Sequence, residues 1–473
     1  MKRFLLLLCA GLCITSTANA QIFPVKTIAK TGNDTNRINF AYLPDGFQSW
    51  RLGKFDTLTN GVYSYMMSIS PFKEYAGFFN AYSVEVPSVD SGAVHLNIAI
   101  DCPPLSLFPI ASPNTYFNSS FDNAGIHRLA YPKNSAAMSS VLLANIPAYD
   151  LTFTLINSNE YGGAGGGTDI SATVNASSKE ISVHETGHSL GDLQDEYWSG
   201  YGWEAPNMTK ETDPTKVKWK NWIGTQNVGI YNYPSTAPAS TVWYRPHQNC
   251  KMYQLGSPFC PVCKEALITS IYKRVTPIDS IYPLATSTVS IDNTTPVTFL
   301  FKPVYPNPNT LTFSWQLNGT AIGTADTMLS LSYTQLAGGT NKLIAFVTDT
   351  TALSRSNLPT KGYVFTIEWT VEKATSGGGT SVTNVNTSGK FTYRMYPVPA
   401  KDILYLECDN NTNASAVQYR IFSTIGTLVR QGTLMLGKGE QVIPIDIAGI
   451  AAGAYNYQLS GDGVYVNGKI LVQ

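Results

Sequence analysis

The first 275 residues hold a strand-like apolar run, a glycine-rich stretch and a helix-like pattern in close succession. The run Leu151–Ile156 reads Leu-Thr-Phe-Thr-Leu-Ile, and such residues favour a β-strand. Residues 161–167 read Tyr-Gly-Gly-Ala-Gly-Gly-Gly. Ser177 and Glu180 then have the Ser-x-x-Glu spacing of a helix-capping box, just before the apolar Ile181. We therefore predict a strand, a glycine segment and a helix. The glycines suit either the close approach of a substrate backbone or a flexible loop.

After about residue 275 the pattern changes to short β-type runs separated by Pro, Asn and Gly, at the spacing typical of a β-sandwich. The runs are Thr288–Ile291, Val297–Phe301, Leu311–Trp315 and Lys342–Thr348. Trp315, followed by the turn residues Asn318 and Gly319, suits an immunoglobulin-like sandwich of about 100 residues. We predict this sandwich over residues 276–373 and expect it to act as a spacer.

The N-terminus has the three parts of a secretion signal. Lys2 and Arg3 supply the charge, residues 4–14 form the apolar stretch, and Ala18-Asn19-Ala20 is the cleavage site. We expect residues 1–20 to be removed. Leucine, not a small residue, precedes both cysteines of this segment, which argues against a lipid anchor. Because no later apolar run approaches the ~18 residues that span a bilayer, we expect no transmembrane segment.

Composition narrows the class of protein. The length of 473 residues suggests two to four domains. Charged residues make up 14% of the chain, with 32 basic and 32 acidic side chains, so no basic patch argues for a nucleic-acid partner. The hydrophobic content of 43% is ample for buried cores, and the 27 tyrosines favour β-structure.

The candidate chemistry lies in the predicted helix. His184 and His188 are four residues apart, which places both imidazoles on one helix face, close enough to share a metal ion. Glu185 lies about 100° further round the helix, where it can reach a metal-bound water. Gly191 falls where a left-handed residue commonly ends a helix. We predict one catalytic Zn²⁺ held by the two histidines, with Glu185 as general base.

The whole segment from His184 to Tyr197 reads His-Glu-x-Gly-His-x-x-Gly-x-Leu-x-Asp-Glu-Tyr, and it resembles the signature of the IgA-peptidase family of zinc metallopeptidases. The resemblance extends over about residues 25–275, through the segments Arg37–Phe47, Ser70–Asn80, Asn157–Gly163, Asn249–Met252 and Phe259–Cys263. It implies an α/β (α+β), metzincin-like catalytic domain, predicted over residues 21–275. Met252 is the candidate for the Met turn that lies beneath the zinc in such folds.

The third zinc ligand is open between two carboxylates. In the commoner metzincin pattern it would fall on Gln194, which is a poor zinc ligand. Asp195 follows directly and is a good oxygen donor, so we choose it, with Glu196 as the alternative. The carboxylate that does not bind could orient a ligand histidine instead. We expect Tyr197 to pack rather than act.

Three cysteines cluster after the helix. Cys250, Cys260 and Cys263 predict one disulfide, from Cys250 to Cys260 or Cys263, because an exported protein can keep disulfides. The rival interpretation is a structural metal site that uses Cys260-x-x-Cys263, but no second pair lies nearby at the usual spacing.

The end of the chain carries a second resemblance. Residues 374–390 are rich in Gly, Ser, Thr and Asn and predict a flexible linker. The segments Met395–Leu404, Tyr419–Gly426, Gly453–Tyr457 and Gly468–Gln473 resemble the C-terminal sorting domain of the type IX secretion system. This implies a β-sandwich sorting domain over residues 391–473, the type IX export machinery as a partner, and a protein that is secreted or attached to the outer cell surface after crossing the periplasm. The competing interpretation of these residues is an adhesive β-sandwich.

Taken together, these features predict a secreted, monomeric zinc endopeptidase that acts on a protein or glycoprotein substrate. Tyr244, Tyr253 and His247 are weak candidates for a second electrophile beside the metal. Two alternatives stay open. One is a cell-surface adhesin or binding protein with a vestigial peptidase domain, and the other is a zinc enzyme that hydrolyses a different amide, such as one in peptidoglycan.

Overall fold

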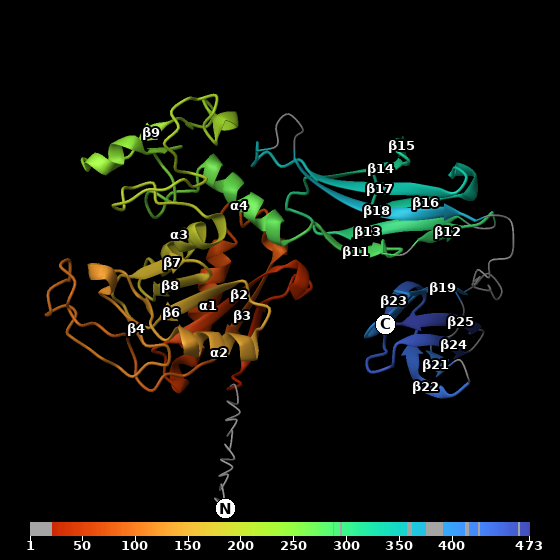
Figure 1. Cartoon of the computed structure of the whole chain (residues 1–473). Coiled ribbons are helices and arrows are strands. Elements are labelled where there is room, and N and C mark those ends of the chain that lie inside the picture. The colour runs from red at the N-terminus through yellow and green to blue at the C-terminus, as the bar shows by residue number, and fades with distance from the viewer. Residues whose placement is uncertain are drawn as a thin grey trace, which may run out of the picture. The chain divides into compact units, whose positions relative to one another are not determined.

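The computed structural model describes residues 21–286, 288–293, 296–356, 362–374, 391–411, 416–423, 426–461 and 464–473. The predicted signal peptide, and the predicted linker apart from Ala374, lie outside the described residues. The chain divides into two compact units, which we describe separately. The first is Met1–Asp279 with Pro303–Thr312 and Val347–Phe365, and the second is Ser280–Lys302, Phe313–Phe346 and Thr366–Gln473. The protein is a mixed α/β, strand-rich structure with several sheets (Figure 1).

A six-stranded sheet forms the centre of the first unit. Its order is β1 (Val25–Ala29), β3 (Phe79–Val84), β2 (Ile38–Asp45), β6 (Leu151–Ile156), β8 (Asp169–Thr173) and β7 (Gly163–Gly166). Strands β3, β2, β6 and β8 run parallel, whereas the two edge strands β1 and β7 are antiparallel to their neighbours. All residues of β2 and β6 are buried, as expected for parallel strands covered on both faces.

Helices cover both faces of this sheet (Figure 1). On one face, Phe40 and Tyr42 of β2 share a core with α1 (Leu52–Met66), α3 (Ser178–Gly191) and α4 (Pro261–Arg274). On the other face, Ala41 and Leu43 pack with α2 (Ser135–Asn145). Successive side chains of a strand point to opposite faces, so one fully buried strand contributes to both cores. The remaining strands of this unit form two short pairs, β4 (Ser119–Ser120) with β5 (Tyr131–Pro132) and β9 (Tyr231–Asn232) with β10 (Tyr244–Arg245).

Helix α3 is present where the sequence predicts it, but its two ends differ from the prediction. The prediction of a capping box is wrong, because the side chain of Ser177 makes no capping hydrogen bond. Glu180 instead accepts from the backbone nitrogen of Gly256, at 2.7 Å, and contacts Lys251 and Tyr65. At the other end Gly191 is still helical, and Asp192 takes the left-handed conformation with φ 52°. Glu180 therefore bonds to residues that are distant in the sequence instead of capping its own helix.

The second unit is built from β-sheets. Three strands form one sheet, β11 (Ile278–Tyr282), β13 (Val297–Pro303) and β16 (Met328–Leu331). Five form another, β12 (Val289–Ile291), β18 (Tyr363–Lys373), β17 (Thr340–Asp349), β14 (Leu311–Leu317) and β15 (Thr320–Ile322). Trp315 is buried and stacks on Trp369, with ring centroids 5.7 Å apart. Four of these strands, β12, β13, β14 and β17, overlap the runs predicted from the sequence, and a few residues of this part of the chain are counted with the first unit.

Two more sheets contain the C-terminal strands. One has the order β19 (Phe391–Tyr396), β20 (Ile403–Asn410) and β23 (Gly439–Asp446). The other has the order β22 (Leu428–Met435), β21 (Ala416–Ser423), β24 (Gly453–Gly461) and β25 (Val464–Val472). Their apolar side chains share one core that includes Leu404, Ile421 and Ile470. Among the helices of the described residues, none is long and apolar enough to cross a bilayer.

Candidate metal centre and substrate cleft

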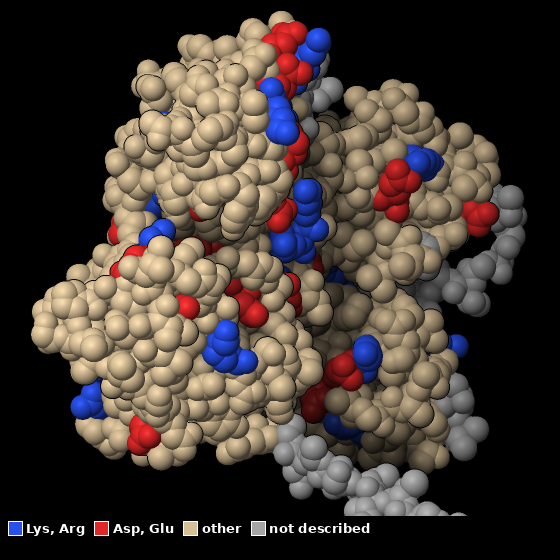
Figure 2. Space-filling view, turned by 60° about the vertical axis from the view of Figure 1, so that its left-hand side comes forward, with Lys and Arg blue, Asp and Glu red and all other residues tan. Residues whose placement is uncertain are grey.

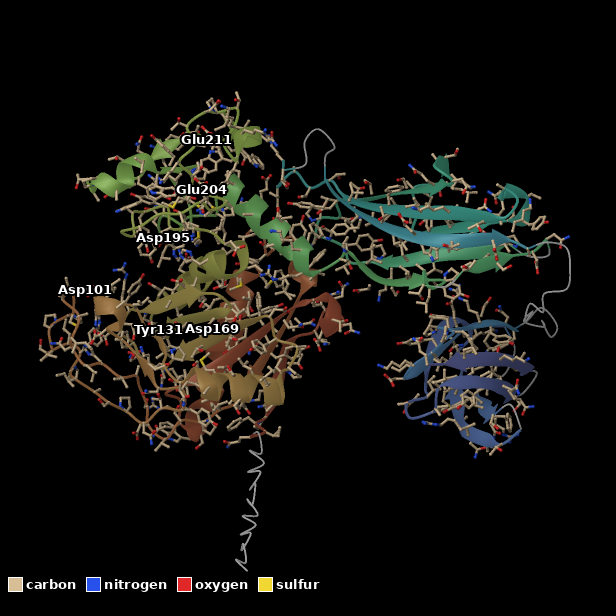
Figure 3. The ribbon with its side chains drawn as sticks, viewed as in Figure 1. Asp101, Tyr131, Asp169, Asp195, Glu204 and Glu211 are labelled. Carbon is tan, nitrogen blue, oxygen red and sulfur yellow. The ribbon has the colours of Figure 1, made fainter. Side chains whose placement is uncertain are left out.

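Helix α3 and the segment after it bring three candidate metal ligands together. His184 and His188 lie one helical turn apart, and their Nε2 atoms are 3.2 Å from each other. Asp195 Oδ1 is 3.1 Å from His184 Nε2 and 3.3 Å from His188 Nε2. Figure 3 shows Asp195 beside α3, in the segment that leads to Glu204 and Glu211. The left-handed turn at Asp192 reverses the chain so that Asp195 returns to the helix face.

Backbone carbonyls hold both imidazole rings from behind. His184 Nδ1 lies 2.9 Å from the carbonyl oxygen of Lys251, and His188 Nδ1 lies 2.7 Å from that of Leu193. A carbonyl oxygen only accepts, so each Nδ1 carries a proton, and each Nε2 is left to face a metal ion or Asp195. Two lone pairs and a carboxylate oxygen within about 3 Å repel one another unless a cation or protons lie between them. The donor set therefore fits a zinc ion.

The pKa values of these groups also indicate a site that favours a cation. Burial acts to raise the pKa of Asp195, but hydrogen bonds with His184 and His188 hold it well below its usual value. Burial acts to lower the pKa of His188, yet its contact with Asp195 raises that pKa to about 9. The three side chains form a pocket that favours positive charge.

The other carboxylate, Glu196, does not join the histidines. Glu196 points into the interior of the protein instead and is fully buried. Its Oε1 atom accepts from Asn207 Nδ2 at 3.2 Å and lies 3.2 Å from Cys263 Sγ. The structure thus places the chosen ligand at the histidines and the alternative in a separate group.

Met252 lies beneath the helix. It is fully buried, and a Cβ built on Gly187 would come 2.5 Å from its Sδ. The glycine inside the His-Glu-Thr-Gly-His run is therefore required by the close approach of Met252 to α3. The backbone nitrogen of Glu196 also donates to the Met252 carbonyl, at 2.7 Å, which ties the Met252 turn to the segment that carries Asp195.

A cavity of about 1020 Å³ opens over these residues. The side chains of His184, Glu185, His188 and Asp195 line it, and β7 forms one wall. The glycines of β7 let the strand pass close to the helix, since a Cβ on Gly165 would meet Glu185 Oε2 at 2.6 Å. The other walls come from Ile126, Arg128 and Leu129, from Tyr197, Trp198, Ser199, Tyr201 and Trp203, and from residues 253–255.

The polar side chains that line this cleft are only partly those expected from the sequence. Tyr253 lines it, but Tyr244 and His247 do not, and His247 Nε2 lies 3.1 Å from the Gln226 carbonyl instead. Arg128 also lines the cleft, although no local pattern in the sequence marks it. Tyr197 lines it too, and burial together with its hydrogen bond to Asp195 raises its pKa. The expectation that Tyr197 only packs is therefore incomplete.

The thiols of Cys250, Cys260 and Cys263 are buried beside Glu196 and free. The Sγ atoms of Cys250 and Cys263 lie 3.7 Å apart. The predicted disulfide among these residues stays a prediction. On the face drawn in Figure 2, Lys, Arg, Asp and Glu are sparse and scattered over a mostly uncharged surface, in line with the low charge content.

Solved structures resemble this chain only weakly. SGBP-B of a Bacteroides ovatus mixed-linkage glucan utilization locus, solved with a mixed-linkage heptasaccharide, is 16% identical, with 41% of this chain and 47% of that chain covered and a TM-score of 0.16. Dimeric latent PorU from Porphyromonas gingivalis is 12% identical, with 49% of this chain and 22% of that chain covered and a TM-score of 0.18. The chain thus spans less than half of either structure's length. No curated protein matches this chain.

Family models match both ends of the chain. The model described as IgA Peptidase M64 matches residues 26–237, which include α3 and Asp195. The model described as a secretion system C-terminal sorting domain matches residues 394–473. Such a sorting domain indicates export, followed by secretion or attachment to the cell surface. Residues 26–237 therefore match the IgA Peptidase M64 family, and residues 394–473 match a sorting domain of the type IX secretion system.

Proposed function

We propose that the protein is a secreted zinc-dependent endopeptidase with a metzincin-like site. His184, His188 and Asp195 hold the ion, and the single observation that carries the proposal is the convergence of their ligand atoms, 3.1 to 3.3 Å apart, at the floor of the cleft. A bound zinc ion would supply a Lewis acid that makes water more acidic and polarises a carbonyl group.

Glu185 is the general base of this mechanism. It follows His184 on α3 and faces the cleft, beside the backbone of Gly165. Its carboxylate takes a proton from the attacking water and then passes it to the leaving amine. Tyr197 and Arg128 are the lining side chains that can stabilise negative charge on the scissile carbonyl oxygen, by a hydroxyl hydrogen bond and by a positive charge.

The cleft suits a peptide substrate. Its volume of about 1020 Å³ is at the upper end of pockets for small ligands, which leaves room for several residues of an extended chain. Strand β7 lies at the edge of the sheet and forms one wall, so the outer backbone groups of Ala164–Gly166 are placed to pair with an added strand. We propose that the substrate binds along β7, with its scissile bond over Glu185.

The test compares the mature wild-type protein with Glu185→Gln and Glu185→Ala on an unfolded protein and on a glycoprotein substrate. Removing a general base costs about 10²–10⁴-fold in rate. We expect that loss with unchanged zinc content and melting temperature. Equal cleavage by all three proteins would refute the role of Glu185. A wild-type protein that binds zinc at neither histidine of α3 would favour the adhesin alternative.

A further inference from the structure

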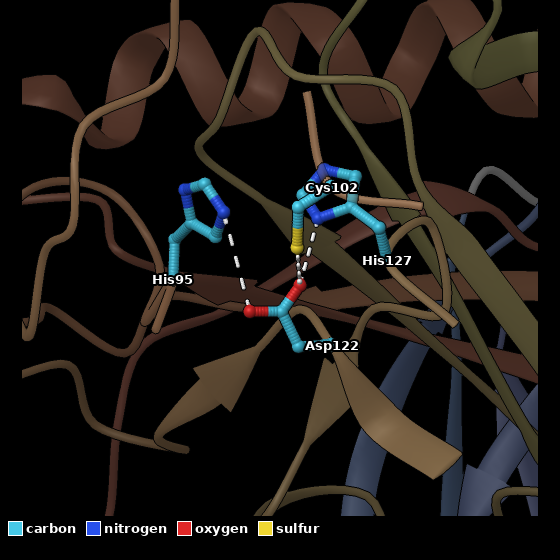
Figure 4. A group of neighbouring side chains, drawn as sticks. All are labelled: His95, Cys102, Asp122 and His127. Atoms are coloured by element: carbon cyan, nitrogen blue, oxygen red, sulfur yellow. Dashed lines mark hydrogen bonds and ion pairs between the residues drawn. The ribbon is translucent and has the colours of Figure 1, made fainter. Parts of the chain in front are cut away.

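The segment between β3 and α2 has little regular structure, yet it contains a buried polar group. In its described residues the regular elements are the two-residue strands β4 and β5 and one short 3-10 turn. Four side chains from this segment meet in Figure 4, namely His95, Cys102, Asp122 and His127. His95, Asp122 and His127 are buried, and Cys102 is partly buried. Loops rarely bury such groups without a partner that balances their charge and polarity.

The four side chains surround a common point. Asp122 Oδ1 lies 2.7 Å from His127 Nδ1 and 3.1 Å from Cys102 Sγ. Asp122 Oδ2 lies 4.0 Å from His95 Nε2. One ligand atom from each side chain lies within 4.8 Å of the other three. Two nitrogens, a thiol and a carboxylate are the donor types of a tetrahedral zinc site.

A second carboxylate supports both histidines from outside this group. Glu160 Oε1 is 2.6 Å from His127 Nε2, and Glu160 Oε2 is 3.9 Å from His95 Nδ1. The outer nitrogen of each ring therefore faces Glu160, and the inner nitrogen faces Asp122. This carboxylate–histidine arrangement is the one that orients histidine ligands at zinc.

The group lacks a lysine or arginine partner among the described residues. The carboxylates of Glu160 and Asp122 lie 2.6 to 4.0 Å from histidine nitrogens, and Asp122 Oδ2 also accepts from the backbone nitrogens of Leu96 and Ile98. Neither ring nitrogen of His95 has a hydrogen-bond partner, although the side chain is 3% exposed. Two buried carboxylates without such a partner are costly. A divalent cation would balance both charges and give the His95 nitrogen a partner.

We propose that His95, Cys102, Asp122 and His127 bind a structural zinc ion, with Glu160 orienting the two histidines. The site does not depend on the proposed peptidase activity. Its consequence is mechanical, because Ile126 and Arg128, the neighbours of His127, and Tyr161, the neighbour of Glu160, line the cleft. One ion would therefore fix the positions of the segments around His127 and Glu160, two irregular parts of the cleft wall.

The first test measures zinc in the mature full-length protein by mass spectrometry of the metal. We expect the double variant His95→Asn/His127→Asn to contain one zinc per chain less than wild type. The matched control is His247→Asn, since His247 lies outside the group and contacts Gln226. A double variant with the same zinc content as wild type would overturn the proposal.

The second test uses unaltered protein, so it does not depend on whether a variant folds. Cys102 is partly exposed, and a thiol that binds zinc reacts slowly with iodoacetamide. We expect Cys102 to be protected in zinc-loaded protein and to become alkylated after chelation, as read by peptide mass mapping. Equal alkylation of Cys102 before and after chelation would overturn the proposal.

An independent group of four buried side chains carries a second inference. Glu196 Oε1 lies 3.2 Å from Cys263 Sγ and 3.8 Å from Cys260 Sγ, and the Sγ of Cys250 is 3.7 Å from that of Cys263. The other oxygen of Glu196 is buried without a hydrogen-bond partner. The backbone nitrogen of Cys260 donates to Cys250 Sγ at 3.3 Å.

We infer that these three thiols and Glu196 form a second closed metal site, rather than containing the disulfide predicted from the sequence. A disulfide would use two thiols and leave the buried carboxylate unbalanced, whereas zinc would use all four groups. Alkylation under denaturing, non-reducing conditions, with a chelator present, distinguishes the metal site from the disulfide. We expect Cys250, Cys260 and Cys263 all to be alkylated, and Cys260→Ser to lower the zinc content by one per chain. A peptide pair joined by a disulfide, 2 Da below the sum of its free thiol forms, would overturn the inference.

Discussion

Two groups of histidine and carboxylate in the same unit differ in their access to solvent. At the cleft, the side chains of His188 and Asp195 are 19% and 15% exposed. In the loop segment, the side chains of His95 and Asp122 are 3% and 1% exposed. A catalytic zinc keeps an open position for water and substrate, whereas a structural zinc is closed by protein ligands. The same side-chain types therefore suit hydrolysis in one place and structural support in the other.

The two groups also differ in what holds their ligands. A helix carries His184 and His188, and backbone carbonyls of Lys251 and Leu193 fix the rings. In the loop group, Glu160 alone faces the outer nitrogen of both rings, and its neighbours belong to irregular segments. A helix keeps its geometry without a metal, but loops are held by the contacts they make. Loss of metal should therefore stop activity at the first site and loosen the structure at the second.

Matched removal of one carboxylate from each group gives the largest expected effects. Asp195→Asn should lower kcat/KM by more than the ~10–100-fold cost of losing an outer-sphere partner, with little change in stability. Asp122→Asn should lower the free energy of unfolding by about 3 kcal/mol or more, because buried partners lose their counter-charge. Steady-state kinetics and urea denaturation measure both. The comparison fails if the two variants show the same pattern of losses.

Removal of metal by a chelator should separate the sites in order of exposure. We expect activity to disappear at a chelator concentration at which Cys102 is still protected from alkylation, and zinc to restore it. The melting temperature should fall only when the site that contains Cys102 has lost its zinc as well. Simultaneous loss of activity, Cys102 protection and stability over the whole titration would contradict separate open and closed sites.

Gly165→Ala should have a smaller effect, confined to the open site. The new Cβ would lie 2.6 Å from Glu185 Oε2 and displace that carboxylate, so kcat should fall by up to ~10²-fold. Gly166→Ala is the control, because a Cβ there meets nothing within 4 Å. Equal kcat values for the two variants would show that β7 does not position Glu185.

Met252→Leu should have the smallest effect. The side chain is buried beneath Gly187, and a swap of similar volume costs less than about 1.5 kcal/mol. We expect a small drop in melting temperature by calorimetry, with zinc content and kcat close to wild type. Loss of zinc from this variant would give Met252 a role beyond packing.

Local pattern was enough to predict the open site in outline, because its ligands lie within twelve residues of one another. Helix periodicity places His184 and His188 together, and Asp195 follows after one turn. Sequence reasoning missed the position of Arg128 in the cleft and the distant partners of Glu180. It also missed the loop group, since His95 and His127 are 32 residues apart and share no periodic element.

Residue pattern alone predicted the strand Leu151–Ile156, the helix that carries the histidines, and the resemblance of two parts of the chain to known families. Those features depend on residue type and on spacings of a few residues, which helix and strand geometry translate directly into space. Only the tertiary structure decided that Asp195, not Glu196, faces the histidines, and that Glu196 joins the three cysteines. It also brought His95, Cys102, Asp122, His127 and Glu160 together. Such groupings depend on how loops of many residues close, and no local spacing encodes that closure.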